Sequence, residues 1–321
     1  MSKQWSLPKP DILIVMIIIA AVLGLVAPIS GQAAEWFSIA TKIAIAVLFF
    51  LYGARLSPAE ALAGLKNWRL HLTILAFTFV AYPLIGLGLG PVRDVLPPGM
   101  YDGILYLTLV PSTVQSSVAF TSIARGNVAG AIVSASASNL LGVVITPLLV
   151  MLLMTGGSGQ VTVDGGVFLD IAIQLLLPFF LGQLTRRWVA EFAAKKATKS
   201  VDRGSIAMVV YSAFSAGMIS GVWRSVTLAQ IVGLTVFSIA LVAAMLALTR
   251  LISGWLGFDR ADRIAIEFCG SKKSLATGLP MAAVIFAGVD ISLLILPLMI
   301  YHQVQLMICS WLASRYARNE A

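Results

Sequence analysis

The sequence predicts an all-helical, multi-pass membrane protein with ten transmembrane helices, arranged as two inverted five-helix repeats. Of its 321 residues, 59% are hydrophobic and only 11% are charged, whereas soluble domains have about 25% charged residues. Ten apolar segments are long enough to cross the hydrocarbon core as helices. Basic residues are concentrated in alternate connections. These observations assign the net charge of +8 to membrane topology, with the lipid bilayer as partner and no nucleic acid.

The apolar segments follow one another with short connections rich in turn residues, such as "PISGQ", "TGGSGQ" and "FAGVD". The first segment is longer than the apolar core of a signal peptide, so we interpret it as a spanning helix. The first repeat is expected over residues 1–155 and the second over 156–321. The ten expected spans are 11–29, 36–55, 69–89, 102–124, 130–154, 167–187, 204–222, 229–252, 263–287 and 291–314.

The positions of lysine and arginine predict the orientation, because basic residues in short loops favour the cytoplasmic side. With ten spans both termini share one side, and the opposite loops hold only Arg93 and Arg224. We therefore expect an integral protein of the plasma membrane or bacterial inner membrane, with both termini cytoplasmic. The basic residues on the cytoplasmic side are Lys3, Lys9, Arg55, Lys66, Arg69, Arg125, Arg186, Arg187, Lys195, Lys196, Lys199, Arg203, Arg250, Arg260, Arg263, Arg315 and Arg318.

The fourth span of each half is interrupted by polar residues. The first interruption is "LVPSTVQSSVAF", around Pro111, and the second is "EFCGSKKSLATGLP", at 267–280. An odd number of spans per half makes the second copy inverted. Inverted repeats with interrupted segments at matching places indicate a transporter whose site lies between the repeats. The alternative is that these are ordinary proline and glycine positions, which membrane helices tolerate.

The ninth span places a carboxylate and two ammonium groups inside the membrane. At 1.5 Å per residue from Arg263, Glu267 lies about 6 Å deep and the two lysines about 14–15 Å deep. A lysine at this depth costs at least about 2.5 kcal/mol, so Lys272 and Lys273 need partners or a water-filled cavity. The alternatives are that one lysine is a buried structural charge and that Glu267 pairs with a neighbouring span or with Arg263. The polar residues of this break are Gly270, Ser271, Lys272, Lys273 and Ser274.

Further polar residues lie in the fourth, fifth and tenth spans. Hydroxyl and amide oxygens suit either sodium or a substrate carboxylate, although a single serine often bonds only its own backbone. In the fifth span, Asn139 is a candidate ligand or interhelical hydrogen bond, and Ser136 is either a site residue or a close-packing position. His302 either relays protons or packs with a hydrogen bond. The candidates of the fourth span are Ser112, Thr113, Gln115, Ser116 and Ser117.

The sequence offers no pattern typical of a disulfide-bonded, metal-binding or catalytic protein. Cys269 and Cys309 both lie in apolar segments, so we expect neither a disulfide framework nor a thiolate metal site. The sequence has no metal-ligand spacing, Ser–His–Asp set or phosphate loop. We therefore expect no enzyme and no cofactor, except that a sodium ion remains possible.

Two long motifs resemble the bile acid:sodium symporter superfamily, in its SBF-like branch. They are "ARGNVAGAIVSASASNLLGVVITPLL", after the broken fourth span, and "IEFCGSKKSLATGLPMAAVIF", in the ninth. The resemblance implies a panel domain of spans 1, 2, 6 and 7 and a core domain of spans 3–5 and 8–10. It also implies that helices 4 and 9 are broken and cross in the core, that substrate binds between the domains, and that the core holds two sodium sites.

Carried over by position, the resemblance implies a possible sodium ion at Glu267, Ser116 and Ser117. The residues that follow the glutamate and contribute oxygens correspond to Phe268, Gly270 and Ser271, the fifth-span hydroxyls to Ala135 and Ser136, and a third-span glutamine to Thr78. This chain departs from the pattern because Ser271 and Lys272 stand where the sodium symporters have Gln-Asn. We therefore hypothesise that a lysine replaces at least one sodium ion, so that transport is uniport, proton-coupled or coupled to one sodium.

The function predicted is secondary transport of a small, anionic organic solute by alternating access. One alternative is a regulator of ion homeostasis with the same fold and without bile-acid transport. The other is a membrane-embedded receptor or enzyme, which the lack of a catalytic constellation disfavours. The sequence leaves open the solute, the coupling ion and the oligomeric state.

Overall fold

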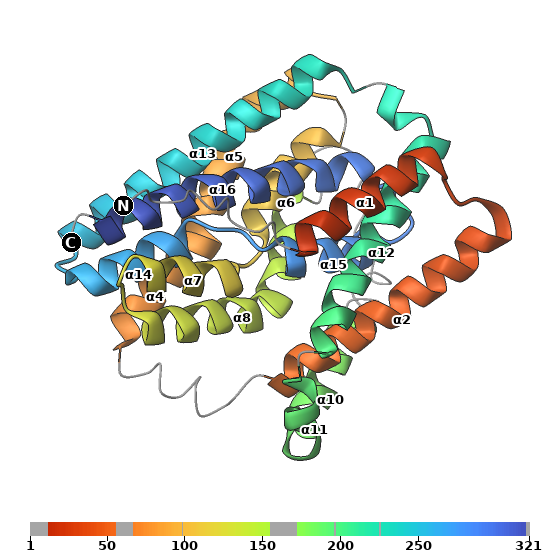
Figure 1. The fold of residues 1–321 in the computed structure, drawn as a ribbon. Coiled ribbons are helices and arrows are strands. Elements are labelled where there is room, and N and C mark those ends of the chain that lie inside the picture. The colour runs from red at the N-terminus through yellow and green to blue at the C-terminus, as the bar shows by residue number, and fades with distance from the viewer. Residues whose placement is uncertain are drawn as a thin grey trace, which may run out of the picture.

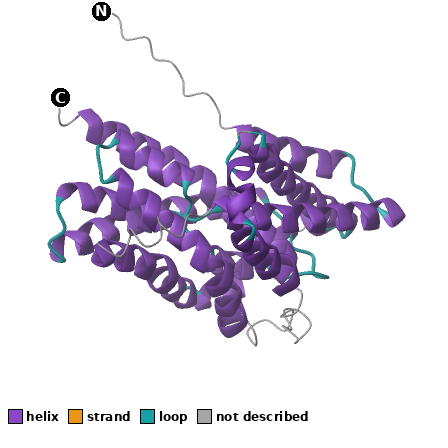
Figure 2. Cartoon of the chain, turned by 90° about the horizontal axis from the view of Figure 1, so that it is seen from below, coloured by secondary structure: helices purple, strands orange, loops and turns teal. Residues whose placement is uncertain are grey.

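The computed structural model describes residues 12–55, 67–97, 99–154, 172–195, 197–224 and 226–318. Within these ranges the chain is built of helices joined by short loops (Figures 1 and 2), as the sequence predicts. The α-helices are α1 (Ile12–Val26), α2 (Gly31–Arg55), α4 (Trp68–Ala76), α5 (Tyr82–Gly88), α6 (Met100–Leu109), α7 (Gln115–Ile123), α8 (Val128–Met154), α10 (Leu177–Leu184), α11 (Arg186–Ala193), α12 (Thr198–Ile219), α13 (Leu228–Trp255), α14 (Arg260–Gly270), α15 (Leu275–Ile285) and α16 (Ser292–Arg318).

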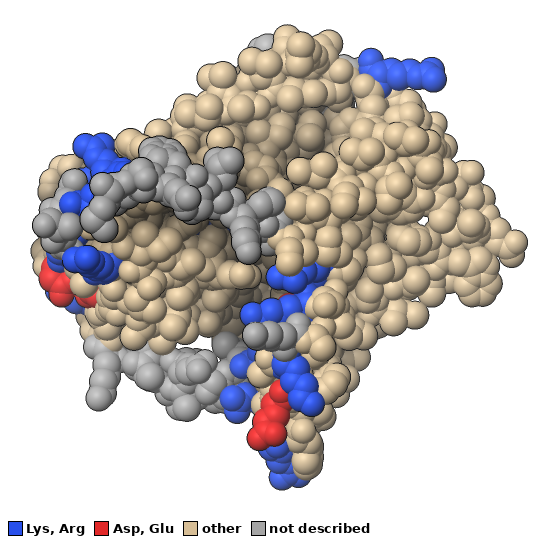
Figure 3. Space-filling model, viewed as in Figure 1, with Lys and Arg blue, Asp and Glu red and all other residues tan. Residues whose placement is uncertain are grey.

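Five helical stretches of the described residues are long and apolar enough to cross a membrane: α2, Trp68–Gly88, α8, α13 and α16. The shorter stretches α1 and Ala172–Leu184 are also apolar. Large apolar side chains such as Ile43, Leu152 and Val236 are more than half exposed. Over the face shown in Figure 3, most of the surface carries neither acidic nor basic side chains. Such a surface suits lipid rather than water, and the protein is a multi-pass membrane protein.

The helices form two packed groups (Figure 1). In the first, the α2 group, α2 packs on α10, α11 and α12, and α12 packs on α1. In the second, the α16 group, α16 packs on α6, α7, α13 and α15, and α14 packs on α4, α7, α8 and α13. The α2 group meets the α16 group through α12, which contacts α15 and α16. The interface between the α2 group and the α16 group therefore lies in the middle of the molecule.

The third span is continuous but not uniformly α-helical. A π-helical turn, Phe77–Ala81, joins α4 to α5. Such turns have i to i+5 backbone hydrogen bonds and occur often at functional sites.

The start of α14 is fixed by Asp262, whose carboxylate accepts hydrogen bonds from Asn67 Nδ2 at 3.0 Å and Asn127 Nδ2 at 2.6 Å. These bonds tie α14 to the beginnings of α4 and α8.

Two glycines allow α2 and α10 to pack with their backbones in close approach. A Cβ atom at Gly53 would overlap the carbonyl oxygen of Phe179, and one at Gly182 would overlap the carbonyl oxygen of Phe50. Small residues at such crossings are a common device of membrane helix pairs, because lipid supplies no hydrophobic drive for association. The close approach makes α2 and α10 a rigid pair inside the α2 group.

We expect Gly182→Ala to lower the thermal unfolding midpoint of the purified protein. The added methyl group meets backbone atoms, which cannot swing aside as a flexible side chain can, and overpacking costs about 1–3 kcal/mol. The control is Gly233→Ala in α13, where a Cβ atom would meet nothing within 4 Å and helix propensity favours alanine. Equal midpoints for the two variants would contradict this account of the pair.

Candidate functional site

Both predicted interruptions are breaks between half-helices. α6 ends at Leu109 and α7 begins at Gln115, while α14 ends at Gly270 and α15 begins at Leu275. The two connecting segments touch, because the Ser274 amide donates to the Pro111 carbonyl at 2.8 Å. Two helix C-termini and two helix N-termini therefore meet in one place, which we call the crossing: residues 110–114 and 271–274 with the adjoining half-helix ends.

Hydroxyl groups close the C-terminal end of α14. Ser112 Oγ donates to the Cys269 carbonyl at 2.6 Å, and Ser117 Oγ donates to the Phe268 carbonyl at 3.0 Å. Ser271 Oγ donates to the Glu267 carbonyl at 2.5 Å. The last carbonyls of a helix have no N–H partner within the helix. The three serine hydroxyls provide hydrogen-bond donors in place of the backbone N–H groups that are missing because α14 ends here. Ser112, Ser117 and Ser271 are thus brought together at the end of α14.

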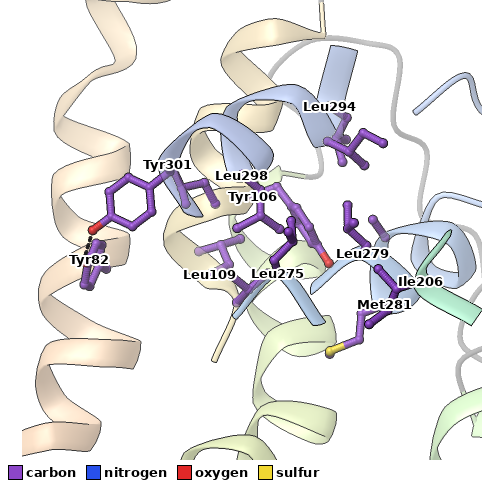
Figure 4. Packing of buried hydrophobic residues seen from close by; sticks show 14 of the residues in the cluster. Tyr82, Tyr106, Leu109, Ile206, Leu275, Leu279, Met281, Leu294, Leu298 and Tyr301 are labelled. Carbon is purple, nitrogen blue, oxygen red and sulfur yellow. Dashed lines mark hydrogen bonds between the residues drawn. The ribbon is translucent and has the colours of Figure 1, made fainter. Parts of the chain in front are cut away.

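A pair of buried tyrosines completes this end. The Tyr82 hydroxyl lies 2.5 Å from the Tyr301 hydroxyl, and they lie 2.5 and 3.0 Å from the Ser271 carbonyl oxygen. Figure 4 shows the two rings reaching toward each other from different helices. Gly270, the last residue of α14, packs between Phe77 and Thr249. Tyr82 and Tyr301 were not predicted from the sequence, where a tyrosine in an apolar segment looks like a packing residue.

Lys273 is fully buried, and its ammonium group is fully hydrogen-bonded. Nζ donates to the carbonyl oxygens of Thr78, Thr108 and Val110 at 2.7–2.8 Å. It also lies 4.2 Å from the centre of the Tyr82 ring, close enough for a cation–π contact. The hydroxyl of Thr78 bonds its own backbone, at Ile74. Thr78 therefore joins the site through its carbonyl oxygen rather than through its side chain.

Lys272 is equally buried but its ammonium group is not hydrogen-bonded to any described residue. Nζ lies 3.9 Å from the centre of the Phe120 ring and 5.3 Å from that of Phe268. Cation–π contacts of this kind stabilise a desolvated charge by about 2 kcal/mol, which is less than the cost of burying it. The adjacent lysines thus differ: Lys273 Nζ donates to three carbonyl oxygens, whereas Lys272 Nζ has no hydrogen-bond partner among the described residues.

The Glu267 carboxylate points toward the C-terminal part of α16. Its two oxygens accept hydrogen bonds from the Tyr316 hydroxyl at 2.9 and 3.0 Å, and Arg250 Nη1 donates to the same hydroxyl at 2.9 Å. No described basic residue lies within ion-pair distance of Glu267, and this includes Arg263. Ser116, another of the three expected sodium ligands, donates its hydroxyl to Thr113 Oγ1 at 3.3 Å.

Asn139 connects the fifth span to both breaks. Its amide nitrogen donates to the Ser112 carbonyl at 2.6 Å, and its amide oxygen accepts from Thr277 Oγ1 at 2.6 Å. Ser138 adds a second link, because its Oγ accepts from the Ser112 amide at 3.0 Å. Ser274 caps α15, accepting from the Thr277 amide at 3.2 Å. Asn139 therefore makes interhelical hydrogen bonds in this structure, and it also lines the central cavity.

His302 belongs to a short hydrogen-bonded chain in the tenth span. Its Nδ1 lies 2.8 Å from Gln305 Nε2. Gln305 in turn pairs with the backbone of Lys273, accepting from its amide at 2.9 Å and donating to its carbonyl at 2.8 Å. This pairing fixes the extended backbone of the break. His302 also lines the central cavity.

A cavity of about 1360 Å³ extends from the crossing to the end of the molecule that bears Arg318 and Arg55. Walls come from both helix groups: Tyr52, Phe179 and Ile206 from the α2 group, and Leu140, Thr277 and Met307 from the α16 group. Figure 3 shows the surface hollowed between the two sides of the molecule. The predicted site residues that line this cavity are Thr113, Gln115, Ser116, Ser136, Asn139, Ser274 and His302.

The mouth of the cavity is basic. Among the described residues, Arg55 forms an ion pair with Asp202 at 2.6 Å, and Asp202 is the only acidic residue of the described cavity lining. Figure 3 shows Lys and Arg side chains gathered beside the hollow. A concave surface lined by one sign of charge concentrates ions of the opposite sign. The other basic residues that line the cavity, none of them in an ion pair with a described residue, are Lys195, Lys199, Arg203 and Arg318.

Comparison with known proteins identifies the family of the chain. Residues 11–318 match the SBF-like CPA transporter family. The chain is 49% identical to "Uncharacterized protein PA2026" of Pseudomonas aeruginosa, over 97% of this chain and 94% of that protein. It is 44% identical to "Putative symporter YfeH" of Escherichia coli K12, over 91% and 88%, and 31% identical to "Sodium/bile acid cotransporter 7" of Xenopus tropicalis, over 86% and 84%. The chain belongs to the SBF-like CPA transporter family, a family of membrane transporters and not of enzymes.

Proposed function

We propose that this protein carries a small anionic organic solute across the membrane by alternating access. The observation that carries the proposal is the cavity of about 1360 Å³ between the two helix groups, open toward a basic mouth and ending at the crossing. In this account the α2 group is the panel and the α16 group is the core. Rocking of one group against the other moves the access from one side of the membrane to the other.

The charge around the cavity favours an anion. Gln115 and Ser116, in the first turn of α7, and Ala276 and Thr277, in the first turn of α15, line the cavity. Helix N-termini carry partial positive charge and unpaired N–H groups. The unpaired ammonium of Lys272 lies against Phe120, which is part of the same wall. A carboxylate or sulfonate at the crossing would therefore meet positive potential from three sources.

The polar chemistry of the crossing also supports a reduced role for sodium. The carbonyl oxygens of Phe268, Cys269 and Ser271 already accept hydrogen bonds. A sodium ion there would have to displace these hydroxyl donors. We propose that transport does not require two sodium ions, and that it proceeds as uniport, with proton coupling, or with one sodium at Glu267, Ser116 and Ser117.

Two further features belong to the proposal. The breaks in the fourth and ninth spans occur at matching places in the halves 1–155 and 156–321, which supports an inverted repeat. Arg55, Lys195, Lys199, Arg203 and Arg318, all expected on the cytoplasmic side, line one mouth of one cavity. This supports an inward-facing conformation with both termini cytoplasmic.

Uptake of a radiolabelled organic anion into proteoliposomes tests this function. Taurocholate and small carboxylates serve as probes, each beside a neutral amide of the same carbon skeleton. We expect saturable uptake of at least one anion and none of its amide, and loss of uptake in a folded Glu267→Ala variant. The control is Glu191→Ala on the exposed part of α11. Unchanged uptake in Glu267→Ala would remove Glu267 from the mechanism, and preference for the neutral amides would contradict the proposal.

A further inference from the structure

The C-terminal end of α6 is closed by a charge, whereas the C-terminal end of α14 is closed by neutral groups. Thr108 and Val110, at the end of α6, both direct carbonyl oxygens at Lys273 Nζ. At the end of α14 the donors are the hydroxyls of Ser112 and Ser117 and the tyrosine pair. The two half-helix ends meet at the same crossing. They differ in the side chains that donate hydrogen bonds to their last carbonyls: a lysine ammonium at α6, and serine and tyrosine hydroxyls at α14.

The groups around Lys273 Nζ form a compact set of oxygen ligands. Three carbonyl oxygens, from Thr78, Thr108 and Val110, lie within 2.8 Å of the nitrogen. They come from two separate elements, the π-helical turn of the third span and the end of α6. The ring of Tyr82 covers the site at 4.2 Å. Carbonyl oxygens that converge in this way are the ligands that monovalent and other hard cations take in proteins.

The negative end of the α6 dipole adds to the attraction. A helix C-terminus carries roughly half a negative charge from its unpaired carbonyls, and here these carbonyls are buried away from water. Without a cation, three carbonyl oxygens would face one another unpaired in an apolar interior, which is costly. The ammonium has three N–H donors, and the site has three acceptors. The number of donors therefore matches the number of acceptors without any other partner.

We propose that the Lys273 ammonium is a tethered monovalent cation that fills a cation site made by the Thr78, Thr108 and Val110 carbonyl oxygens. In the native protein no mobile cation enters this site. When the side chain is truncated, free ammonium, methylammonium or sodium binds there and restores the crossing. Lys273 is a positioning residue in this account, because it holds α6, the third span and the break of the ninth span together.

Thermal unfolding of the purified full-length protein in detergent tests the proposal. For Lys273→Ala we expect a lower midpoint than wild type in N-methylglucamine chloride, a cation too large for the site. We expect the midpoint to rise with the logarithm of ammonium or methylammonium concentration at constant ionic strength, as binding to the folded state requires. Wild type is expected to show no such rise. This readout involves no transported solute, so it stays informative even if the proposed anion transport fails.

Two further variants separate a cation site from ordinary packing. Lys273→Met keeps most of the side-chain volume but blocks the path, so it is expected to be destabilised without rescue by ammonium. Lys272→Met, one residue earlier, is expected to show no dependence on the cation. Equal responses of Lys273→Ala to ammonium and N-methylglucamine would overturn the proposal. So would failure to recover folded Lys273→Ala from membranes extracted in ammonium, because a free cation would then not occupy the site.

Discussion

Replacing Asn139 by leucine is expected to reduce transport by about tenfold or more while the helices of the protein still form. The amide of Asn139 bonds the Ser112 carbonyl in the first break and the Thr277 hydroxyl at the start of α15. Leucine has a similar size but offers neither bond. An unpaired buried carbonyl costs about 1–3 kcal/mol, and the two half-helices lose the link that sets their relative position.

The matched control for this change is Ser136→Ala, one turn earlier on α8. Ser136 lines the same cavity but holds neither break. We expect Ser136→Ala to change uptake much less than Asn139→Leu in the same proteoliposome assay, with circular dichroism confirming equal helix content. If Asn139→Leu transports as well as Ser136→Ala, the bridge from α8 to the crossing is not needed for transport.

Replacing Lys272 by methionine is expected to raise stability and abolish anion transport. The ammonium is fully buried and unpaired among the described residues, with only aromatic rings against it. Replacing buried ionic groups by apolar side chains of similar volume often stabilises a protein by about 1–4 kcal/mol. In the proposed function, the same charge supplies positive potential behind Phe120, which lines the cavity. Its loss should therefore weaken anion binding while strengthening the fold.

Thermal unfolding and uptake are measured on the same preparations of Lys272→Met, Lys273→Met and wild type. The account expects opposite changes in stability, up for Lys272→Met and down for Lys273→Met, since only Lys273 has its donors satisfied. Lys272→Arg, which keeps the charge, should retain part of the uptake. A Lys272→Met protein that is destabilised and still takes up anions would show that its ammonium is a structural charge.

The helical class and the two breaks could be predicted, because the length of each apolar segment and the polar residues that interrupt it can be read directly from the sequence. Pro111 and the polar run after it mark where α6 ends, and the run 270–274 marks where α14 ends. These features depend on local properties of the chain, which sequence patterns report well.

The partners of the polar groups could not be predicted in the same way. Lys273 is bound by carbonyl oxygens, and every residue has a carbonyl, so no residue type marks Thr108 or Val110 as ligands. Thr277 and Gln305 are polar and stood near the predicted site, but their pairings with Asn139 and the Lys273 backbone depend on how four helices meet. Glu267 shows the same limit, because Tyr316 lies 49 residues away in the sequence.

Sodium dependence of anion uptake is the most direct test of the central claim, that this transporter moves an anion without two coupled sodium ions. Initial rates are measured in proteoliposomes while N-methylglucamine replaces sodium at constant ionic strength. The account predicts saturable uptake that either persists without sodium or rises with a Hill coefficient of about one or less. Uptake that vanishes without sodium and rises with clear two-ion cooperativity would contradict it.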